Sequence, residues 1–127
     1  YMNEFSAAIG LAQLKKLDKT NNQRRKIVKK YYDEILLENK MPFDKGCSYH
    51  FYWIRVKNRT KFRKILSEKG IETGIHYKPI HTFSFYKSKI KLPITENISK
   101  EIVTLPTHPN LTGDNIEKII KTVNNSI

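Results

Sequence analysis

Ser48-Tyr-His-Phe-Tyr-Trp-Ile-Arg-Val56 is the stretch of sequence that decides the fold class of this chain. Aromatic and β-branched residues fill it, and that composition is typical of a β-strand. Because side chains alternate along a strand, the stretch has two faces. One face holds His50, Tyr52, Ile54 and Val56, and the other holds Tyr49, Phe51, Trp53 and the stem of Arg55. Helical patterns lie on both sides of the stretch, so the chain is expected to mix helices and strands.

The elements that follow are predicted from caps and stop signals. Asn58 can cap a helix that runs to Lys69, and Gly70 can end that helix as a C-terminal cap. A short second strand is expected from Ile71 to Ile75. Residues 76–94 have no clean period and are expected to form an ordered, functional loop.

The last third of the sequence predicts a helix, a strand and a helix. Thr95 is expected to cap a short helix to Ile102, and Val103 to Leu105 is expected to be the last strand. Thr112 can cap the final helix. The apolar positions of that helix are Ile116, Ile119, Ile120 and Val123. The element order predicts an α+β fold: a small three- to four-stranded sheet with helices packed on one face, preceded by a long N-terminal helix.

The long helix, straight or kinked, is predicted for Asn3 to Asn39. Its expected buried face repeats every three or four residues, at Ala7, Gly10, Leu14, Leu17, Asn21, Arg24, Val28, Tyr31 and Ile35. Two shorter helices joined near Asn21-Asn22 are the alternative. About 37 residues give a helix of roughly 55 Å, whereas a domain of this size has a radius of gyration of about 14 Å. We therefore expect a single domain over 1–127 whose first helix also packs against another domain or subunit.

Composition limits the possible partners. The formal net charge is +12, and residues 46–94 hold most of it, with eleven basic and two acidic side chains. This charge suits a nucleic acid, a phosphate-bearing small molecule, or simply solvated lysines. No apolar run approaches the ~20 residues of a membrane helix, so no membrane partner is expected. The single cysteine, Cys47, excludes an internal disulfide and suits a cytoplasmic protein.

Few residues in the sequence indicate chemistry. Cys47 and His50 have a Cys-x2-His spacing, but a zinc site needs more ligands and a Cys–His nucleophile needs a third group, so no metal site and no catalytic pair are predicted. The cluster that remains is Gly74-Ile-His-Tyr-Lys-Pro-Ile-His81. It places two imidazoles and a phenol at a strand end, before a turn stiffened by proline, where they can project into a cleft. A pair of surface histidines is the alternative.

Three segments of the sequence resemble one protein family. They are Met2–Asp18 (MNEFSAAIGLAQLKKLD), Gly70–Tyr77 with Pro79–His81 (GIETGIHY and PIH), and Leu105–Thr112 (LPTHPNLT). In this order and spacing they resemble the C-terminal domain of the DegT/DnrJ/StrS-type sugar aminotransferases. Together they cover essentially the whole chain.

The resemblance implies an activity and a place in a larger protein. Enzymes of this family are pyridoxal-phosphate aminotransferases of fold type I, which move an amino group, usually from glutamate, to a keto sugar that is most often nucleotide-linked. The chain would be their small C-terminal domain, and its first helix, about 3–39, would bridge to a large domain that carries the cofactor-binding lysine. The resemblance therefore implies no catalytic residue, no bound cofactor and no activity in this chain alone.

The resemblance also implies site residues. The expected substrate-binding residues are His76, Tyr77 and His81. The expected interface with the large domain or with the second subunit of a homodimer includes Asn3, Glu4, Phe5 and Ile9. Tyr1 stands where the family pattern has Arg. The family's Arg usually makes a substrate contact across the dimer interface, and the resemblance does not carry that contact over to Tyr1. His108 lies in a motif that we interpret as a turn.

Two other interpretations stay open at the level of sequence. A basic α+β module could bind single-stranded nucleic acid if aromatic residues were interleaved with basic ones on an exposed sheet face. Tyr49, Phe51 and Trp53 could do this. A stand-alone homologue without catalytic activity is the other interpretation.

Overall fold

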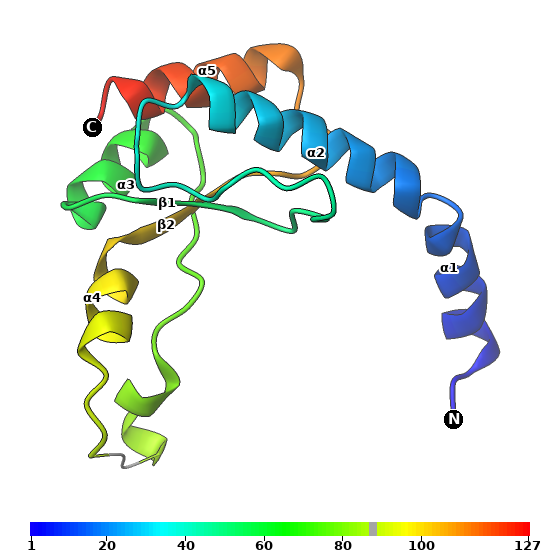
Figure 1. Cartoon of the computed structure of the whole chain (residues 1–127). Coiled ribbons are helices and arrows are strands. Elements are labelled where there is room, and N and C mark those ends of the chain that lie inside the picture. The colour runs from blue at the N-terminus through cyan, green and yellow to red at the C-terminus, as the bar shows by residue number, and fades with distance from the viewer. Residues whose placement is uncertain (87–88) are drawn as a thin grey trace.

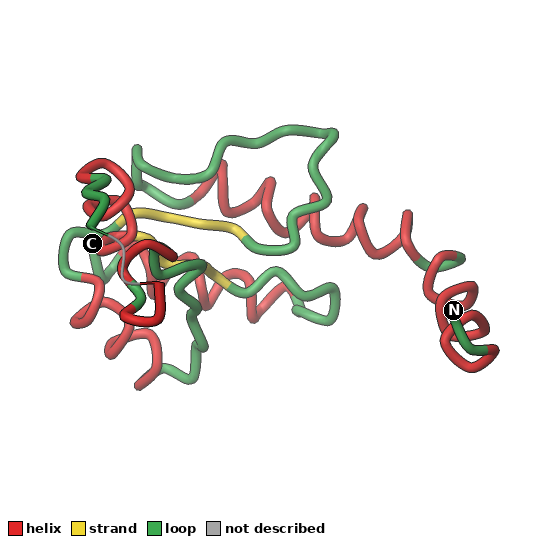
Figure 2. Tube along the Cα trace, turned by 90° about the horizontal axis from the view of Figure 1, so that it is seen from below, coloured by secondary structure: helices red, strands yellow, loops and turns green. Residues whose placement is uncertain are grey.

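The centre of the molecule is a small antiparallel sheet. The computed structural model describes residues 1–86 and 89–127. Its sheet consists of β1 (Tyr52–Arg55) and β2 (Ile102–Leu105), in a register that sets Trp53 against Thr104. Figure 2 shows the two strands lying side by side. The α+β class is confirmed.

The sheet is narrower than predicted. Among the described residues it has two strands rather than three or four, and one isolated bridge borders it on each side. These bridges are Lys40–Ile54 and Gly74–Thr104. The expected strand at Ile71–Ile75 is reduced to the second bridge. One reason is that the Arg63 side chain donates to the Thr73 carbonyl oxygen (2.9 Å), which takes that group away from strand pairing.

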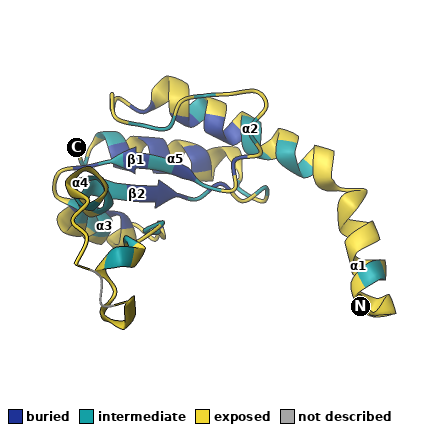
Figure 3. Cartoon of the chain, turned by 60° about the horizontal axis from the view of Figure 1, so that its bottom comes forward, coloured by how far each residue is buried: buried dark blue, intermediate teal, exposed yellow. Residues whose placement is uncertain are grey.

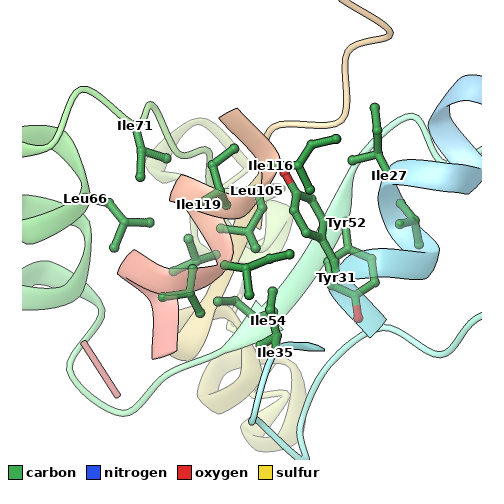
Figure 4. Packing of buried hydrophobic residues seen from close by; sticks show 14 of the residues in the cluster. Ile27, Tyr31, Ile35, Tyr52, Ile54, Leu66, Ile71, Leu105, Ile116 and Ile119 are labelled. Atoms are coloured by element: carbon green, nitrogen blue, oxygen red, sulfur yellow. The ribbon is translucent and has the colours of Figure 1, made fainter. Parts of the chain in front are cut away.

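The helices cover one face of the sheet, as predicted. They are α2 (Leu17–Glu34), α3 (Arg59–Glu68) and α5 (Gly113–Asn124). The strand residues in the core beneath them are Tyr52, Ile54, Val103 and Leu105. Figure 4 shows apolar side chains of all three helices meeting these strands. The opposite face of the sheet, here called the outer face, carries Trp53, Arg55 and Thr104.

Three helix ends behave as their sequence signals predict. The Asn58 side chain accepts a hydrogen bond from the Lys61 N–H (3.2 Å) at the start of α3, and Gly70 follows α3 with a positive φ of 72°. The Thr112 hydroxyl accepts from the Asn115 N–H (3.3 Å) at the start of α5. The buried residues of α5 are the predicted Ile116, Ile119, Ile120 and Val123.

The predicted long helix is divided into two helices, and the division does not lie at Asn21-Asn22, where the alternative placed it. The chain forms α1 (Glu4–Leu14) and α2, and the break lies at Lys15 and Lys16. There the Lys16 N–H donates to Gln13 (3.0 Å), three residues back instead of four, which tightens the turn and ends α1. The expected continuous buried face is also wrong, because α1 buries no residue while α2 buries Ile27, Val28 and Tyr31.

The end of α2 is fixed by the last helix of the chain. The Asn124 side chain donates to the Glu34 carbonyl oxygen (2.9 Å) and accepts from the Leu36 N–H (3.0 Å). These two bonds satisfy groups that a helix terminus leaves open. They explain why α2 stops at Glu34 and does not run to Asn39. The Tyr31 hydroxyl adds a second link between distant parts of the chain by donating to the Pro106 carbonyl oxygen (2.9 Å).

The strand around Trp53 starts later than predicted. Tyr49 has a positive φ of 50°, which turns the chain and reverses the alternation before β1 begins. Its side chain is therefore buried and stacks on Phe43, with ring centroids 5.9 Å apart, although the sequence placed it beside Phe51 and Trp53. Tyr52, Ile54 and Val56 do share the buried face, as predicted.

The fourth helix, α4 (Pro93–Glu101), starts earlier than predicted. Pro93 occupies the first helical position, where a proline costs no hydrogen bond. Glu96 completes the start, because its carboxylate accepts from the Leu92 N–H (2.9 Å). Thr95 therefore lies inside the helix and does not cap it.

Two projections leave the body on the same side, away from α5 (Figure 1). One is α1, and the other is a segment that we call the arm, residues 77–92 apart from 87–88. The arm contains two 3₁₀ turns, Ile80–Thr82 and Ser84–Tyr86. Figure 3 shows both projections largely in the colour of exposed residues. Within the described part of the chain, no helix is long and apolar enough to cross a membrane.

Candidate functional site

The candidate site lies on the outer face of the sheet, at the edge formed by β2. Gly74 and Thr104 exchange two backbone hydrogen bonds of 3.0 Å each, which attach residues 74–77 to that edge. This attachment places His76 beside Thr104 even though 28 residues separate them in the sequence. The two side chains are linked by a contact of 2.8 Å between His76 Nδ1 and Thr104 Oγ1.

The His76 ring is held on three sides. Phe51 stacks on it in parallel, with centroids 5.2 Å apart and planes within 4°. Tyr77 meets it edge-on at 4.7 Å and 82°. The third side is Gly74, where a Cβ atom would lie only 2.5 Å from His76 Cε1 and 2.6 Å from Thr104 Oγ1. The imidazole therefore occupies a slot that requires glycine at position 74.

The slot opens into a groove of about 420 Å³. Besides His76, Phe51 and Thr104, the groove is lined by residues from α2 and from the segments that flank the two strands. These include Arg24, His50, Thr107 and His108. Tyr77 stands 70% exposed at the side of the His76 ring. The structure thus offers an imidazole, a phenol and a guanidinium to a ligand.

The structure separates His81 from this group. His81 lies in the arm, and its Nε2 is 3.1 Å from the Glu96 carboxylate of α4. Its side chain is mostly buried, at 11% exposure. Of the three predicted substrate residues, His76 and Tyr77 touch each other, whereas His81 is fixed to α4 by its contact with Glu96.

The contacts of Glu96 lead to a prediction about pH. The Leu92 N–H and then the His81 ring hold the pKa of the Glu96 carboxyl below its usual value of 4.5. A carboxylate with a lowered pKa in the folded state contributes stability that is complete above its ordinary pKa and lost as the pH falls through the lowered one. We expect the Leu92 amide to exchange faster as the pH falls from about 5 to 2, after correction for intrinsic exchange.

The matched variant for this prediction is Glu96→Gln. Its Leu92 exchange should not change over this pH range after the same correction, because a glutamine side chain has no charge to lose. Equal pH profiles for the two proteins, measured by hydrogen exchange and NMR, would contradict a role for Glu96 in fixing α4.

The predicted interface residues lie at the free end of α1. Asn3 caps the helix by accepting from the Ser6 N–H (2.8 Å), and Glu4 lies in the first turn, where the helix dipole favours an acidic side chain. Phe5 and Ile9 are 84% and 64% exposed. The apolar face of α1 thus has no neighbour within the described residues.

Lys40 does not fit the lysine of a pyridoxal-phosphate site. An internal aldimine needs a lysine that can lose its proton. Burial lowers the pKa of Lys40, but its ammonium donates to the Ile35 carbonyl oxygen and lies 5.3 Å from the centre of the Tyr32 ring. No group of three or more metal-ligating side chains occurs in the described residues.

The sequence did not identify Thr104, Phe51 or Arg24 as site residues. Thr104 precedes the Leu105-Pro106 motif but gave no chemical signal of its own. Phe51 was assigned correctly to the outer face, although as a possible base-stacking residue. Arg24 is one of many basic residues in the sequence, and the residues around it do not indicate a binding role.

The fold defines the class of protein. Chains of this fold occur in aminotransferases: the aminotransferase TlmJ from Streptoalloteichus hindustanus matches 98% of this chain with a TM-score of 0.90 and 29% identity, over 36% of its own length. Spr1654 from Streptococcus pneumoniae, solved in PLP and PMP forms, shares the fold with a TM-score of 0.90 at 24% identity.

The chain belongs to the DegT/DnrJ/EryC1/StrS aminotransferase family, whose family model matches residues 1–124. A dTDP-3-amino-3,6-dideoxy-alpha-D-galactopyranose transaminase from Aneurinibacillus thermoaerophilus is 34% identical over 97% of the chain. A dTDP-4-dehydro-2,3,6-trideoxy-D-glucose 4-aminotransferase from Saccharopolyspora spinosa is 32% identical over 86%. The chain spans 36% and 30% of the lengths of these two relatives. The resemblance found in the sequence is thereby confirmed.

Proposed function

We propose that this chain is the C-terminal domain of a pyridoxal-phosphate-dependent aminotransferase and supplies substrate contacts for a nucleotide-linked keto sugar. The observation that carries the proposal is the His76 slot, which opens into a groove on the outer face of the sheet. Family membership and the dTDP-sugar substrates named for two relatives support the substrate class. Glutamate as amino donor and a cytoplasmic location belong to the same proposal.

Each site residue has a role in this proposal. His76 and Tyr77 would hydrogen-bond to sugar hydroxyl or phosphate oxygens, and their mutual ring contact would keep them at a fixed spacing. Arg24 adds a positive charge to the same groove, which suits a phosphate. His81 would act from the arm, with its Nδ1 left for the ligand because Nε2 faces Glu96.

The two projections would serve assembly. The exposed apolar residues of α1 and of the segment that precedes it are Tyr1, Met2, Phe5, Ile9, Leu11 and Leu14. Those of the arm are Tyr77, Ile80, Phe83, Phe85, Tyr86, Ile90 and Leu92. Apolar surfaces of this extent usually mark an interface. We propose that a large cofactor-binding domain and the second subunit of a homodimer cover them, and that the chain alone has no transaminase activity.

The proposal is tested by replacing His76 with alanine in the enzyme that carries this domain. Loss of a substrate hydrogen bond should raise KM for the keto sugar by roughly a few-fold to a hundred-fold. The turnover number and the absorbance of the bound cofactor should change little. A variant that lost the cofactor while keeping its sugar affinity would overturn the proposal, and so would one that only melted at a lower temperature.

The nucleic-acid interpretation has lost part of its basis. It needed three aromatic residues on an exposed sheet face. Tyr49 is buried in the core, and one face of the Phe51 ring is occupied by His76. Binding of the chain to single-stranded DNA at low and high salt remains the direct measurement for this alternative.

A further inference from the structure

A buried hydroxyl contacts one nitrogen of the His76 ring. Thr104 Oγ1 lies 2.8 Å from His76 Nδ1, and Thr104 is only 4% exposed. The backbone N–H and C=O of Thr104 are both paired with Gly74, so the residue cannot turn without breaking the edge of the sheet. The backbone of residue 104 is therefore held beside Gly74, and its hydroxyl lies against the imidazole.

The direction of this hydrogen bond follows from the available acceptors. A threonine hydroxyl has one proton, and the neutral imidazole has one donor nitrogen and one acceptor nitrogen. Among the described residues, His76 Nδ1 is the only hydrogen-bond partner of the Thr104 hydroxyl. If His76 were the donor, the Thr104 proton would have no acceptor among the described residues, which is unfavourable for a hydroxyl on a residue this buried. The arrangement that satisfies both groups has Thr104 donating to Nδ1.

We infer that Thr104 is a positioning residue that keeps the neutral His76 imidazole protonated at Nε2. The bond made by one ring nitrogen determines where the proton of the other resides. The Nδ1–Cε1 edge of the ring is the edge that faces Gly74 and Thr104. Nε2 makes no hydrogen bond to a described residue and remains available at the groove.

This tautomer determines what His76 can recognise. A ring that presents Nε2–H is a hydrogen-bond donor toward the groove, so its ligand atom is an acceptor: a hydroxyl, carbonyl or phosphate oxygen. The same ring cannot accept a proton at Nε2 while it remains in this form, so His76 binds and orients a ligand and is not a general base. This deepens the proposed function and rests on it where the ligand is a keto sugar, whereas the tautomer itself does not depend on any ligand.

The first test uses the chain labelled with ¹⁵N and long-range ¹H–¹⁵N spectra of its histidine rings. At a pH where His76 is neutral, its spectrum should show the Nε2–H form alone. Thr104→Val keeps the shape and strand preference of the residue but removes the hydroxyl, and it should give a mixture of the two tautomers. Thr104→Ser should restore the single form.

Thr107→Val is the matched control. Thr107 is equally buried and lines the same groove, but its hydroxyl donates to the His50 carbonyl oxygen (2.9 Å) and does not contact His76. It should leave the His76 spectrum unchanged. A wild-type spectrum with the proton on Nδ1 would overturn the inference, and so would a Thr104→Val spectrum equal to that of the wild type.

The second test measures kinetics in the enzyme that carries this domain. Thr104→Val should raise KM for the keto sugar by about two- to tenfold with little change in the turnover number, and Thr104→Ser should restore the wild-type KM. If the tautomer changes as expected but KM does not, the proposed substrate role of His76 fails and the positioning of its ring stands. If KM rises in both Thr104 variants while the tautomer stays fixed, the hydroxyl does not act through His76 and the inference fails.

Discussion

Gly74→Ala is expected to dismantle the candidate site. The added methyl would lie 2.5 Å from the His76 ring and 2.6 Å from the Thr104 hydroxyl, so either the ring must leave its slot or residue 74 must separate from β2. Overpacking of this kind typically costs about 1–3 kcal/mol of stability. In the enzyme that carries this domain, KM for the keto sugar should rise at least as much as in His76→Ala, because the ring and its Thr104 contact are disturbed together.

Gly113→Ala provides the control for that experiment. Gly113 begins α5, and a Cβ atom built there has nothing within 4 Å. Thermal unfolding should show a lower melting temperature for Gly74→Ala and an unchanged or slightly higher one for Gly113→Ala, since alanine favours a helix over glycine by about 1 kcal/mol. Equal melting temperatures and an unchanged KM for Gly74→Ala would show that the slot does not constrain His76.

The chain on its own is expected to self-associate through α1. Phe5, Ile9 and Leu14 are 84%, 64% and 64% exposed, and Phe5 and Ile9 are four residues apart on one side of the helix. Burying such a surface between two copies stabilises the pair by about 25 cal/mol for each Å² of apolar surface removed from water. Light scattering and sedimentation should therefore detect a species larger than 15.0 kDa at micromolar concentration or above.

The double variant Phe5→Asp with Ile9→Asp should be monomeric, because two carboxylates cannot be buried in that interface without a partner. Lys45→Asp is the matched control: it changes the net charge by the same amount at an exposed loop position away from α1. A wild-type chain that stays monomeric at high concentration would contradict this role of α1. Loss of association in the Lys45 variant would point to net charge as the cause.

Local signals in the sequence predicted those parts of the fold that local interactions determine. The Asn58 and Thr112 caps, the Gly70 stop and the apolar face of α5 all depend on residues within a few positions of one another. The break at Lys15 and Lys16 could not be predicted in this way. The spacing of side chains stays in phase across it, and the difference between α1 and α2 is that only α2 has a core to pack against.

The site was predictable in part for the same reason. His76 and Tyr77 are neighbours in a recognisable motif, so the sequence indicated them. Thr104 enters the site only because β2 pairs with Gly74, and a pairing between positions so far apart leaves no trace in a single sequence. His81 belongs to the same motif, but its contact with Glu96 depends on how the arm folds back onto α4.

The two hydrogen bonds that Asn124 makes at the end of α2 have a consequence for synthesis on the ribosome. The side chain joins Glu34 and Leu36 to a residue about ninety positions later, and the Tyr31 hydroxyl reaches forward to Pro106. The core cannot close until α5 has emerged from the exit tunnel, since α5 supplies the buried isoleucines opposite α2. A nascent chain halted before α5 should therefore bind chaperones and be cut readily by proteases, and release of the last helix should end both.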